Sequence, residues 1–547
     1  MKIHFSSGLI NRVAIHVGLI CVLAFVAGCD SFEGDRFPNS EQERRTGRSL
    51  ERMDEKPIAY FLSDIPEVSV NPSGIAPLSA EISFETNVSS KVIVDVLGDS
   101  PLSWEENDPQ TVHRIPLVGL YAGANVARLT FLDEGGRAYS EMEIDVQTEP
   151  LPGFFPNIEV VSADRAKMEP GLNWSDFGAS AGSEFVSYPI AFDEAGQVRW
   201  FFDLSKFGDL AAPIQFLQNG NLLVSFGNQL GEYDLLGREL NSWRIPDWFH
   251  HDIIEKPDGN FIVSVDKVGR DTGKDHIIEI DRQSGAVVNE WDIREVLDVS
   301  RRDFGGTDED WFHMNAVWYS EDDDALIVSG RTQGVIKVTK DNELLWILAP
   351  HRGWGKAGVD STGIETSDYL LTAVNDFGVP LGDNVQNGSV RTEGFDWSWG
   401  QHAPMLLPNG NLFVFDNGVN RSFTNSPGYS RGVEYHIDEA NMTVRQVWAF
   451  GRELGVDFYS SIISDVDYLP QTGNRLIMPG IIYNSSDKRA AMAEVTASGE
   501  LVFYAKIHFK NTNGTGEFVW GQFDLVYRSE RAELVPNGLR IVRPPAS

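Results

Sequence analysis

Residues 251–265 read HDIIEKPDGNFIVSV, where an apolar run, a Pro-Asp-Gly-Asn turn and a second apolar run predict a β-hairpin. Residues 402–416, HAPMLLPNGNLFVFD, repeat this arrangement. Residues 313–330, HMNAVWYSEDDDALIVSG, repeat it with an acidic turn. Each copy begins with a histidine six residues before the turn or the residue that leads into it. If the hairpins repeat around an axis, the three histidines lie at equal depth and face one small volume.

A second type of hairpin alternates with the first. Six segments consist of an apolar strand, a small or acidic turn and a strand that ends in an aromatic residue, as in KVTKDNELLWIL at 337–348. Five of them end on tryptophan, namely Trp200, Trp243, Trp291, Trp346 and Trp448. One hairpin of each type makes a four-stranded blade, so six outer hairpins predict a six-bladed β-propeller. Five inner hairpins are clear, and residues 516–542 are the candidate source of the sixth, so that both chain ends would share the closing blade.

The chain divides into four segments and its fold class is all-β. Residues 151–547 carry the repeats and form the predicted propeller domain. Residues 57–150 hold short alternating strands such as AEISFETN and predict a small, immunoglobulin-like N-terminal β-sandwich. Residues 29–56 are polar and charged, which is typical of a tether. Residues 1–28 are predicted to be a lipoprotein signal peptide.

The signal peptide predicts the location. An apolar run leads into VAGC at 26–29, which resembles a bacterial lipobox whose Cys29 is lipidated. An ordinary cleaved signal peptide or an N-terminal anchor are the alternatives. Cleavage before Cys29 also removes Cys21, so no disulfide forms within the mature chain. We expect a lipid-anchored protein on the periplasmic side of a bacterial membrane, and Asp30 favours the inner membrane.

The composition excludes one class of partner. The 547 residues include 80 Asp plus Glu against 45 Lys plus Arg, for a net charge of -35. This charge argues against nucleic-acid binding, which depends on neutralising phosphates. An anionic substrate would have to meet positive charge at its own site.

Arg331 joins His251, His313 and His402, because it ends the strand that follows the hairpin of His313. Its planar, permanently charged fork of donors suits an oxyanion. His250, beside His251, and Asn315, two residues beyond His313, are further candidates for substrate binding.

Three chemistries fit this cluster. The histidines could hold zinc in a metal-dependent hydrolase. One histidine could be a nucleophile while the other groups hold an oxyanion. The propeller could also bind a ligand without chemistry. Zinc is disfavoured by the arginine and by the lack of a carboxylate ligand, so we expect neither a metal nor another cofactor.

The propeller segments resemble bacterial aryl-sulfate sulfotransferases, the arylsulfotransferase family that does not use adenylyl sulfate donors. The resemblance rests on DWFHMNAVWY, on VSGRTQGVIKV and on FDWSWGQHAPMLLPNGNL, and it covers roughly residues 57–545. Thr332 departs from the histidine that we associate with this position in the family. The family's disulfide is also absent here.

The resemblance implies a ping-pong transfer of a sulfuryl group from an aryl sulfate donor to a phenolic acceptor. It implies that His402 becomes a sulfohistidine. His251, His313 and Arg331 match the positions that grip the sulfuryl oxygens. For the phenol proton we favour His251, because it shares the register of the other two histidines, and His250 is the alternative for that role. The resemblance further suggests a homodimer.

The long insertions predict the entrance to the site. Segments 350–395 and 417–432 should project from one face of the propeller. Because flat rings give contact area without charge, Trp354, Trp397 and Trp399 predict an aromatic-lined entrance.

Overall fold

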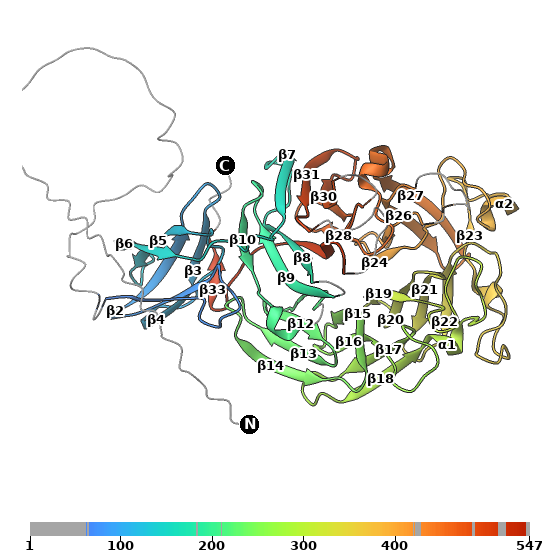
Figure 1. Ribbon diagram of the computed structural model, residues 1–547, viewed down its shortest axis with the longest axis horizontal. Coiled ribbons are helices and arrows are strands. Elements are labelled where there is room, and N and C mark those ends of the chain that lie inside the picture. The colour runs from blue at the N-terminus through green and yellow to red at the C-terminus, as the bar shows by residue number, and fades with distance from the viewer. Residues whose placement is uncertain are drawn as a thin grey trace, which may run out of the picture.

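The computed structural model describes residues 62, 65–181, 184–208, 211–419, 421, 428–483, 487–511 and 521–542. Within these residues six antiparallel blades surround an axis, and a smaller β domain lies beside them (Figure 1). The all-β fold class, with a six-bladed propeller behind an immunoglobulin-like domain, is confirmed.

Each blade has four strands, numbered here from the axis outward. They are β32, β8, β9 and β10 (Leu525–Ala532, Leu172–Ser180, Phe185–Phe192, Val198–Phe201), β11 to β14 (Gln215–Phe216, Leu222–Phe226, Gln229–Tyr233, Glu239–Arg244), β15 to β18 (Trp248–Glu255, Phe261–Asp266, His276–Ile280, Val287–Asp292), β19 to β22 (Met314–Ser320, Ala325–Gly330, Gly334–Thr339, Leu344–Leu348), β24 to β27 (His402–Leu406, Leu412–Asp416, Arg431–Asp438, Thr443–Phe450) and β28 to β31 (Asp465–Leu469, Asn474–Met478, Arg489–Val495, Leu501–His508).

The turn chemistry of the inner hairpins explains why the sequence pattern predicts them correctly. Strands β15 and β16 pair from Ile253↔Val263 to Glu255↔Phe261 around the predicted turn. Gly259 and Gly410 occupy equivalent turn positions with φ of 90° and 79°, a region that glycine enters without steric cost. In the acidic turn Asp324 adopts φ 49° instead, which aspartate tolerates better than most residues.

The ends of the propeller chain close the ring. Strand β32 lies within the candidate region 516–542, pairs with β8 and supplies the innermost strand of that blade. The closing blade therefore combines the end of the chain with the start of the propeller, although one strand and not a hairpin is added. Strand β7 (Asn157–Ala163) crosses over to the outer edge of the blade β28–β31.

The N-terminal domain is one curved set of strands. It comprises β1 (Glu67–Val70), β2 (Ala80–Val96), β3 (Leu102–Glu106), β4 (Gln110–Leu117), β5 (Ala124–Leu132) and β6 (Ala138–Gln147). The long strand β2 pairs with β1 and β4 through its first half and with β3 and β5 through its second half. From the far end of the chain, β33 (Leu539–Ile541) returns to pair with β3, so the chain end ties the two domains together.

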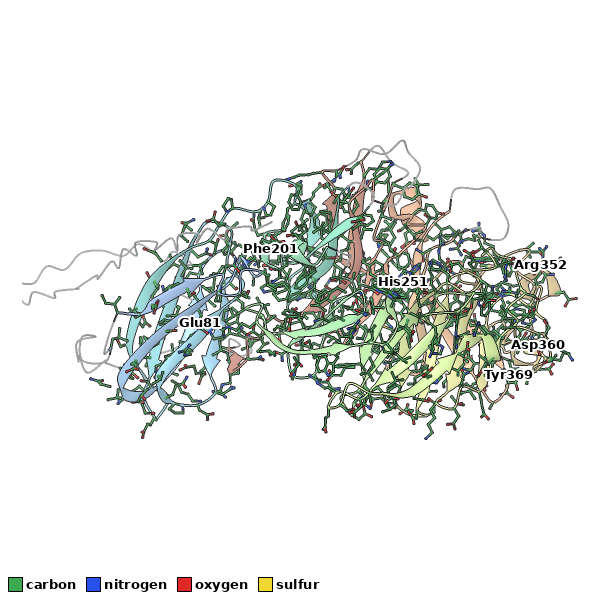
Figure 2. The ribbon with its side chains drawn as sticks, turned by 60° about the horizontal axis from the view of Figure 1, so that its bottom comes forward. Glu81, Phe201, His251, Arg352, Asp360 and Tyr369 are labelled. Atoms are coloured by element: carbon green, nitrogen blue, oxygen red, sulfur yellow. The ribbon has the colours of Figure 1, made fainter. Side chains whose placement is uncertain are left out.

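The remaining elements are short helices and one edge strand. They are η2 (Ser205–Phe207), α1 (Ile293–Val296), η3 (Thr366–Tyr369), α2 (Asp383–Gln386) and η5 (Arg452–Phe458), with β23 (Thr372–Ala373) at a blade edge. In Figure 2 the insertion residues Arg352, Asp360 and Tyr369 lie at the end opposite Glu81, and His251 lies between them.

The predicted targeting segments lie outside the described residues, and this includes Cys29, Asp30 and the tether. In the described part of the chain no helix combines the length and the apolar character needed to cross a bilayer.

Candidate active site

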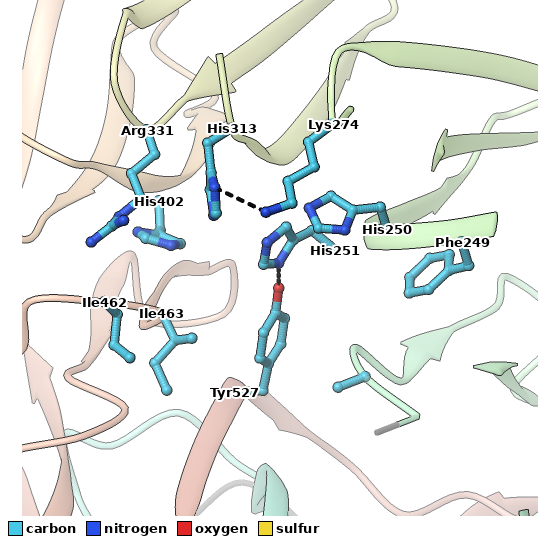
Figure 3. A pocket seen from close by; sticks show the side chains of 11 residues that line it. Phe249, His250, His251, Lys274, His313, Arg331, His402, Ile462, Ile463 and Tyr527 are labelled. Carbon is cyan, nitrogen blue, oxygen red and sulfur yellow. Dashed lines mark hydrogen bonds between the residues drawn. The ribbon is translucent and has the colours of Figure 1, made fainter. Parts of the chain in front are cut away.

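A cavity of about 450 Å³ lies where the inner strands of all six blades begin (Figure 3). One residue from each blade start lines it, namely Ala212, His251, His313, His402, Ile463 and Tyr527. His250, Arg331 and Lys274 add further polar groups, and Phe249 and Ile462 complete the apolar wall. The structure therefore brings together the predicted residues His251, His313, His402 and Arg331, and the further candidate His250 lies with them.

The backbone at these blade starts is strained in a repeated way. His251, His313, Ala403 and Ser464 have φ of 64°, 52°, 51° and 97°, where residues with a side chain rarely lie. Strand pairing slips at the first three of these points, between Phe249 and Ile253, Met314 and Ala316, and His402 and Met405. Such strain costs about 1–3 kcal/mol per residue and collects at functional sites. The imidazoles consequently leave the regular alternation of the strand and face the axis.

The tautomer of His402 follows from its neighbours. Its Nδ1 lies 2.7 Å from Oδ1 of Asn417 and 3.1 Å from the carbonyl oxygen of Gly400. Both partners are acceptors, so Nδ1 carries the proton and Nε2 keeps its lone pair.

Asn417 is itself held in one orientation. Its Nδ2 donates to the carbonyl oxygens of Ser460 and Ile463, each at 2.9 Å. Because both amide hydrogens are used, Oδ1 must be the atom that faces His402. Asn417 is fully buried, so this orientation is fixed by the neighbouring blade.

Burial keeps His402 uncharged. It lowers the pKa of His402 well below the ordinary 6.5, and the nearby charges of Arg528 and Arg331 lower it further, although the hydrogen bond to Asn417 opposes them. At neutral pH the ring is therefore a free base with an available nucleophilic nitrogen.

Arg331 is a cation of the same cavity whose charge acts on His402, and in Figure 3 its guanidinium lies next to the His402 ring. Its backbone N–H donates to the carbonyl of His313 at 3.0 Å, and Nη2 donates to the carbonyl of Ser461 at 3.3 Å. Its buried Nε has no hydrogen-bond partner, and no ion pair joins Arg331 to a carboxylate among the residues that the structure describes. In a chain with charge -35, a half-buried arginine without a carboxylate is a site for an anion.

The other imidazoles are packed closely together. The ring centroid of His251 lies 4.0 Å from that of His250 and 5.4 Å from that of His313. Nδ1 of His251 is hydrogen-bonded to the hydroxyl of Tyr527, and the two rings stack at 5.7 Å. Burial, followed by the neighbouring histidines, holds the pKa of His251 well below 6.5. Burial, followed by Lys274, does the same for His250.

Asn315 does not line the cavity. Its Nδ2 donates to the carbonyl of Gln401 at 2.7 Å, and Arg528 donates to its carbonyl at 2.9 Å. Gln401 in turn donates to the carbonyl of Gly330 at 2.9 Å. Asn315 thus positions the residue before His402 from the neighbouring blade, and it does not face the substrate volume.

The predicted aromatic entrance is wrong. Trp397 and Trp399 are 1 % and 4 % exposed, and they pack between blades with Phe395 and Tyr435. Trp354 covers the guanidinium of Arg301, 4.0 Å from its ring centroid. The aromatic groups that do line the cavity are Phe249 and Tyr527. Thr332 lies beside the site but donates its hydroxyl to the carbonyl of Trp311 at 2.5 Å, so it serves the backbone.

No cluster of three or more His, Cys, Asp or Glu side chains in the described ranges has the geometry to hold a metal ion. The site offers imidazoles together with arginine and lysine, which repel a metal cation. The geometry therefore gives the His₃ hydrolase alternative no support.

Fold and cavity together define a β-propeller whose axial site presents a neutral imidazole and an unpaired guanidinium to an anionic group. The family model described as "Arylsulfotransferase (ASST)" matches residues 157–518, and "Arylsulfotransferase Ig-like domain" matches residues 67–148. The chain belongs to this arylsulfotransferase family and is therefore an enzyme of the transferase class, whose reaction is aryl sulfotransfer.

The chain is 28 % identical over 502 residues to "Arylsulfate sulfotransferase AssT" of Escherichia coli O6:H1, which covers 73 % of this chain and 82 % of that protein. The protein of the same name from Lelliottia amnigena matches with the same identity and coverage. Among solved structures, an auxiliary nutrient binding protein from Bacteroides ovatus aligns with 76 % of this chain and 95 % of its own. Its identity of 10 % and TM-score of 0.29 support no argument.

Proposed function

We propose that this protein moves a sulfuryl group from an aryl sulfate donor to a phenolic acceptor in two steps, with His402 as the carrier. One observation carries the proposal. Asn417 holds the proton on Nδ1 of His402 and leaves Nε2 free, in a cavity that Arg331 lines without a carboxylate partner among the described residues.

In the first step Nε2 forms a bond to sulfur while the bond from sulfur to the aryl oxygen breaks. Negative charge on the sulfuryl oxygens is held by Arg331 through its planar donors. His251 supplies a second donor if the Tyr527 hydroxyl donates its hydrogen bond to Nδ1, because the neutral ring then carries its proton on Nε2. The aryl oxygen leaves as a phenolate and has to gain a proton, a role for which the sequence register favours His251 over His250.

Asn417 also favours the second step. A neutral amide cannot remove the Nδ1 proton, so sulfated His402 stays an N-sulfo-imidazolium. Its positive ring is a good leaving group, and an acceptor phenol can displace it with return of the electron pair to Nε2. The apolar wall of Phe249, Ile462 and Ile463 offers contact area for an aryl ring.

A covalent adduct separates this proposal from a propeller that only binds sulfated or phenolic ligands. We expect that 4-nitrophenyl sulfate without acceptor adds one SO₃ group to the intact protein, that the peptide containing His402 carries it, and that a phenol removes it. Release of phenol with the adduct on another histidine, or no adduct at all, would contradict the assignment. Activity that a chelator removes and zinc restores would favour the metal-dependent hydrolase.

We also propose that the protein is a lipid-anchored enzyme on the periplasmic side of a bacterial membrane. The VAGC sequence at 26–29 supports this location, and the inner membrane and a homodimer stay predictions. Cys29→Ala should release the protein from the membrane fraction or block processing of the signal peptide, as followed by fractionation and mass spectrometry. Membrane association and processing that match the unchanged protein would argue against lipidation.

A further inference from the structure

Three side chains form a hydrogen-bonded cluster on the wall of the cavity. Asp310 precedes β19, and its Oδ2 lies 2.7 Å from Nδ1 of His313. Lys274, in the loop before β17, donates from Nζ to the same oxygen at 2.9 Å. Nζ also lies 3.4 Å from Nδ1 of His313, which is the contact drawn in Figure 3.

The protons in this cluster can be assigned. Burial works against the charge of Asp310, but hydrogen bonds from His313 and Lys274 and their charges hold the pKa of Asp310 below its ordinary value. Asp310 is therefore a carboxylate, which can only accept. Nδ1 of His313 consequently carries a proton, and in the neutral ring Nε2 is a free base.

The other imidazoles lack this support. Among the described residues, His313 is the one imidazole of the cavity with a carboxylate in hydrogen-bond range of a ring nitrogen. His402 is bonded to an amide and His251 to a phenol. Nδ1 of His250 lies 3.9 Å from Asp266, which is too far for a hydrogen bond. An imidazolium is therefore stabilised best at His313, as it is in catalytic Asp-His pairs.

We propose that His313, and not His251, carries the phenol proton in the two-step transfer proposed above. As an imidazolium, His313 gives the Nε2 proton to the aryl oxygen when the bond from sulfur to oxygen breaks, which leaves a phenol and a neutral ring. In the second step the neutral Nε2 takes the proton of the acceptor phenol, whose oxygen attacks sulfur, and the imidazolium is restored. Asp310 and Lys274 act as positioning residues.

The charged groups around His313 set its titration. Those that face it are Asp310, Lys274, Arg331, His250, His251 and His402. Burial is the largest cause and lowers the pKa of His313, the hydrogen bond to Asp310 raises it, and the charges of Lys274 and Arg331 lower it. Removal of Asp310 should therefore lower this pKa, and removal of the Lys274 charge should raise it.

The test measures the two half-reactions separately by rapid quench, in the full-length protein. The first is release of 4-nitrophenol or of plain phenol from its sulfate, with the adduct on His402 measured in parallel. The second is transfer from the loaded enzyme to added phenol at several pH values. The variants are Asp310→Asn and Lys274→Met. Asp308→Asn is the matched control, because Asp308 lies in the same loop but is fully exposed.

We expect Asp310→Asn to slow transfer to phenol and release of plain phenol by about 10²-fold, the usual size of general acid–base catalysis. Release of 4-nitrophenol, a much better leaving group, should change by only a few fold. The acceptor step needs neutral His313, so its rate rises with pH. This rise should move to lower pH in Asp310→Asn and to higher pH in Lys274→Met, and Asp308→Asn should match the unchanged enzyme.

Three results would overturn the inference. Asp310→Asn could slow both leaving groups equally, the pH profiles of the two variants could stay unchanged or move together, or the leaving-group dependence could appear in His251→Gln instead. Each result leaves the two-step transfer intact if the adduct still forms on His402. If the enzyme without substitutions releases phenol at a normal rate but never carries an SO₃ adduct on His402, the proposed carrier is refuted instead.

Discussion

His402→Ala should abolish sulfuryl transfer, with a fall in kcat of about 10⁴-fold or more, because a covalent carrier has no substitute within the two-step route. The variant should still bind aryl sulfate, since Arg331 and the apolar wall stay in place. Phenol release under steady-state conditions and intact mass after donor addition measure the two effects. Neither phenol nor an SO₃ adduct should appear.

The matched control is His436→Ala, which removes an exposed imidazole on an outer strand. It should leave both measurements unchanged. The fold of His402→Ala can be compared with this control by thermal unfolding, because the His402 ring is buried and bonded to Asn417. A His402→Ala enzyme that turns over within tenfold of the control would show that another group accepts the sulfuryl or that water attacks directly.

The fold could be predicted from the repeats because the separate local sequence patterns agree with one another. Alternating apolar strands, turn residues such as Gly259 and the terminal tryptophans all predict one type of blade, and the number of outer hairpins then predicts the number of blades. For the same reason the register that relates His251, His313 and His402 predicts their meeting at the axis. Such periodic information survives in a single sequence.

The partners of these histidines could not be predicted in the same way. Asn417 meets His402 through the strand pairing of one hairpin, yet its orientation depends on carbonyls of the next blade. Lys274 and Tyr527 reach the cavity from a loop and from the closing strand, where no repeat marks them. Asp310 could have been found from the sequence, since it precedes His313 by three residues in the segment DWFHMNAVWY. The prediction of an aromatic entrance was wrong because bulky tryptophans in an insertion fill the space between blades as readily as they line a cavity.

Arg331→Lys should lower kcat/KM for an aryl sulfate by about 10²–10³-fold, the usual loss when a positioned donor to a developing charge is removed. Lysine keeps the charge but replaces the planar fork by a single flexible ammonium, so two sulfuryl oxygens cannot be held at once. The buried Nε of Arg331 has no hydrogen-bond partner in the described part of the protein, so it is available to a ligand, and this donor is lost in the variant. Arg331→Met should fall further, because it removes the charge as well.

The loss should be similar in the two half-reactions. Arg331 holds the sulfuryl group in both half-reactions, so the formation and the discharge of the adduct should slow together, unlike the selective effect expected for Asp310→Asn. Arg445→Lys is the control, because Arg445 lies on an outer strand and pairs only loosely with Asp376 at 3.3 Å. An Arg331→Lys enzyme with kcat/KM within about twofold of this control would exclude a bidentate grip on the sulfuryl oxygens. The charge of Arg331 would then act only at long range, and its unpaired position beside His402 would need another cause.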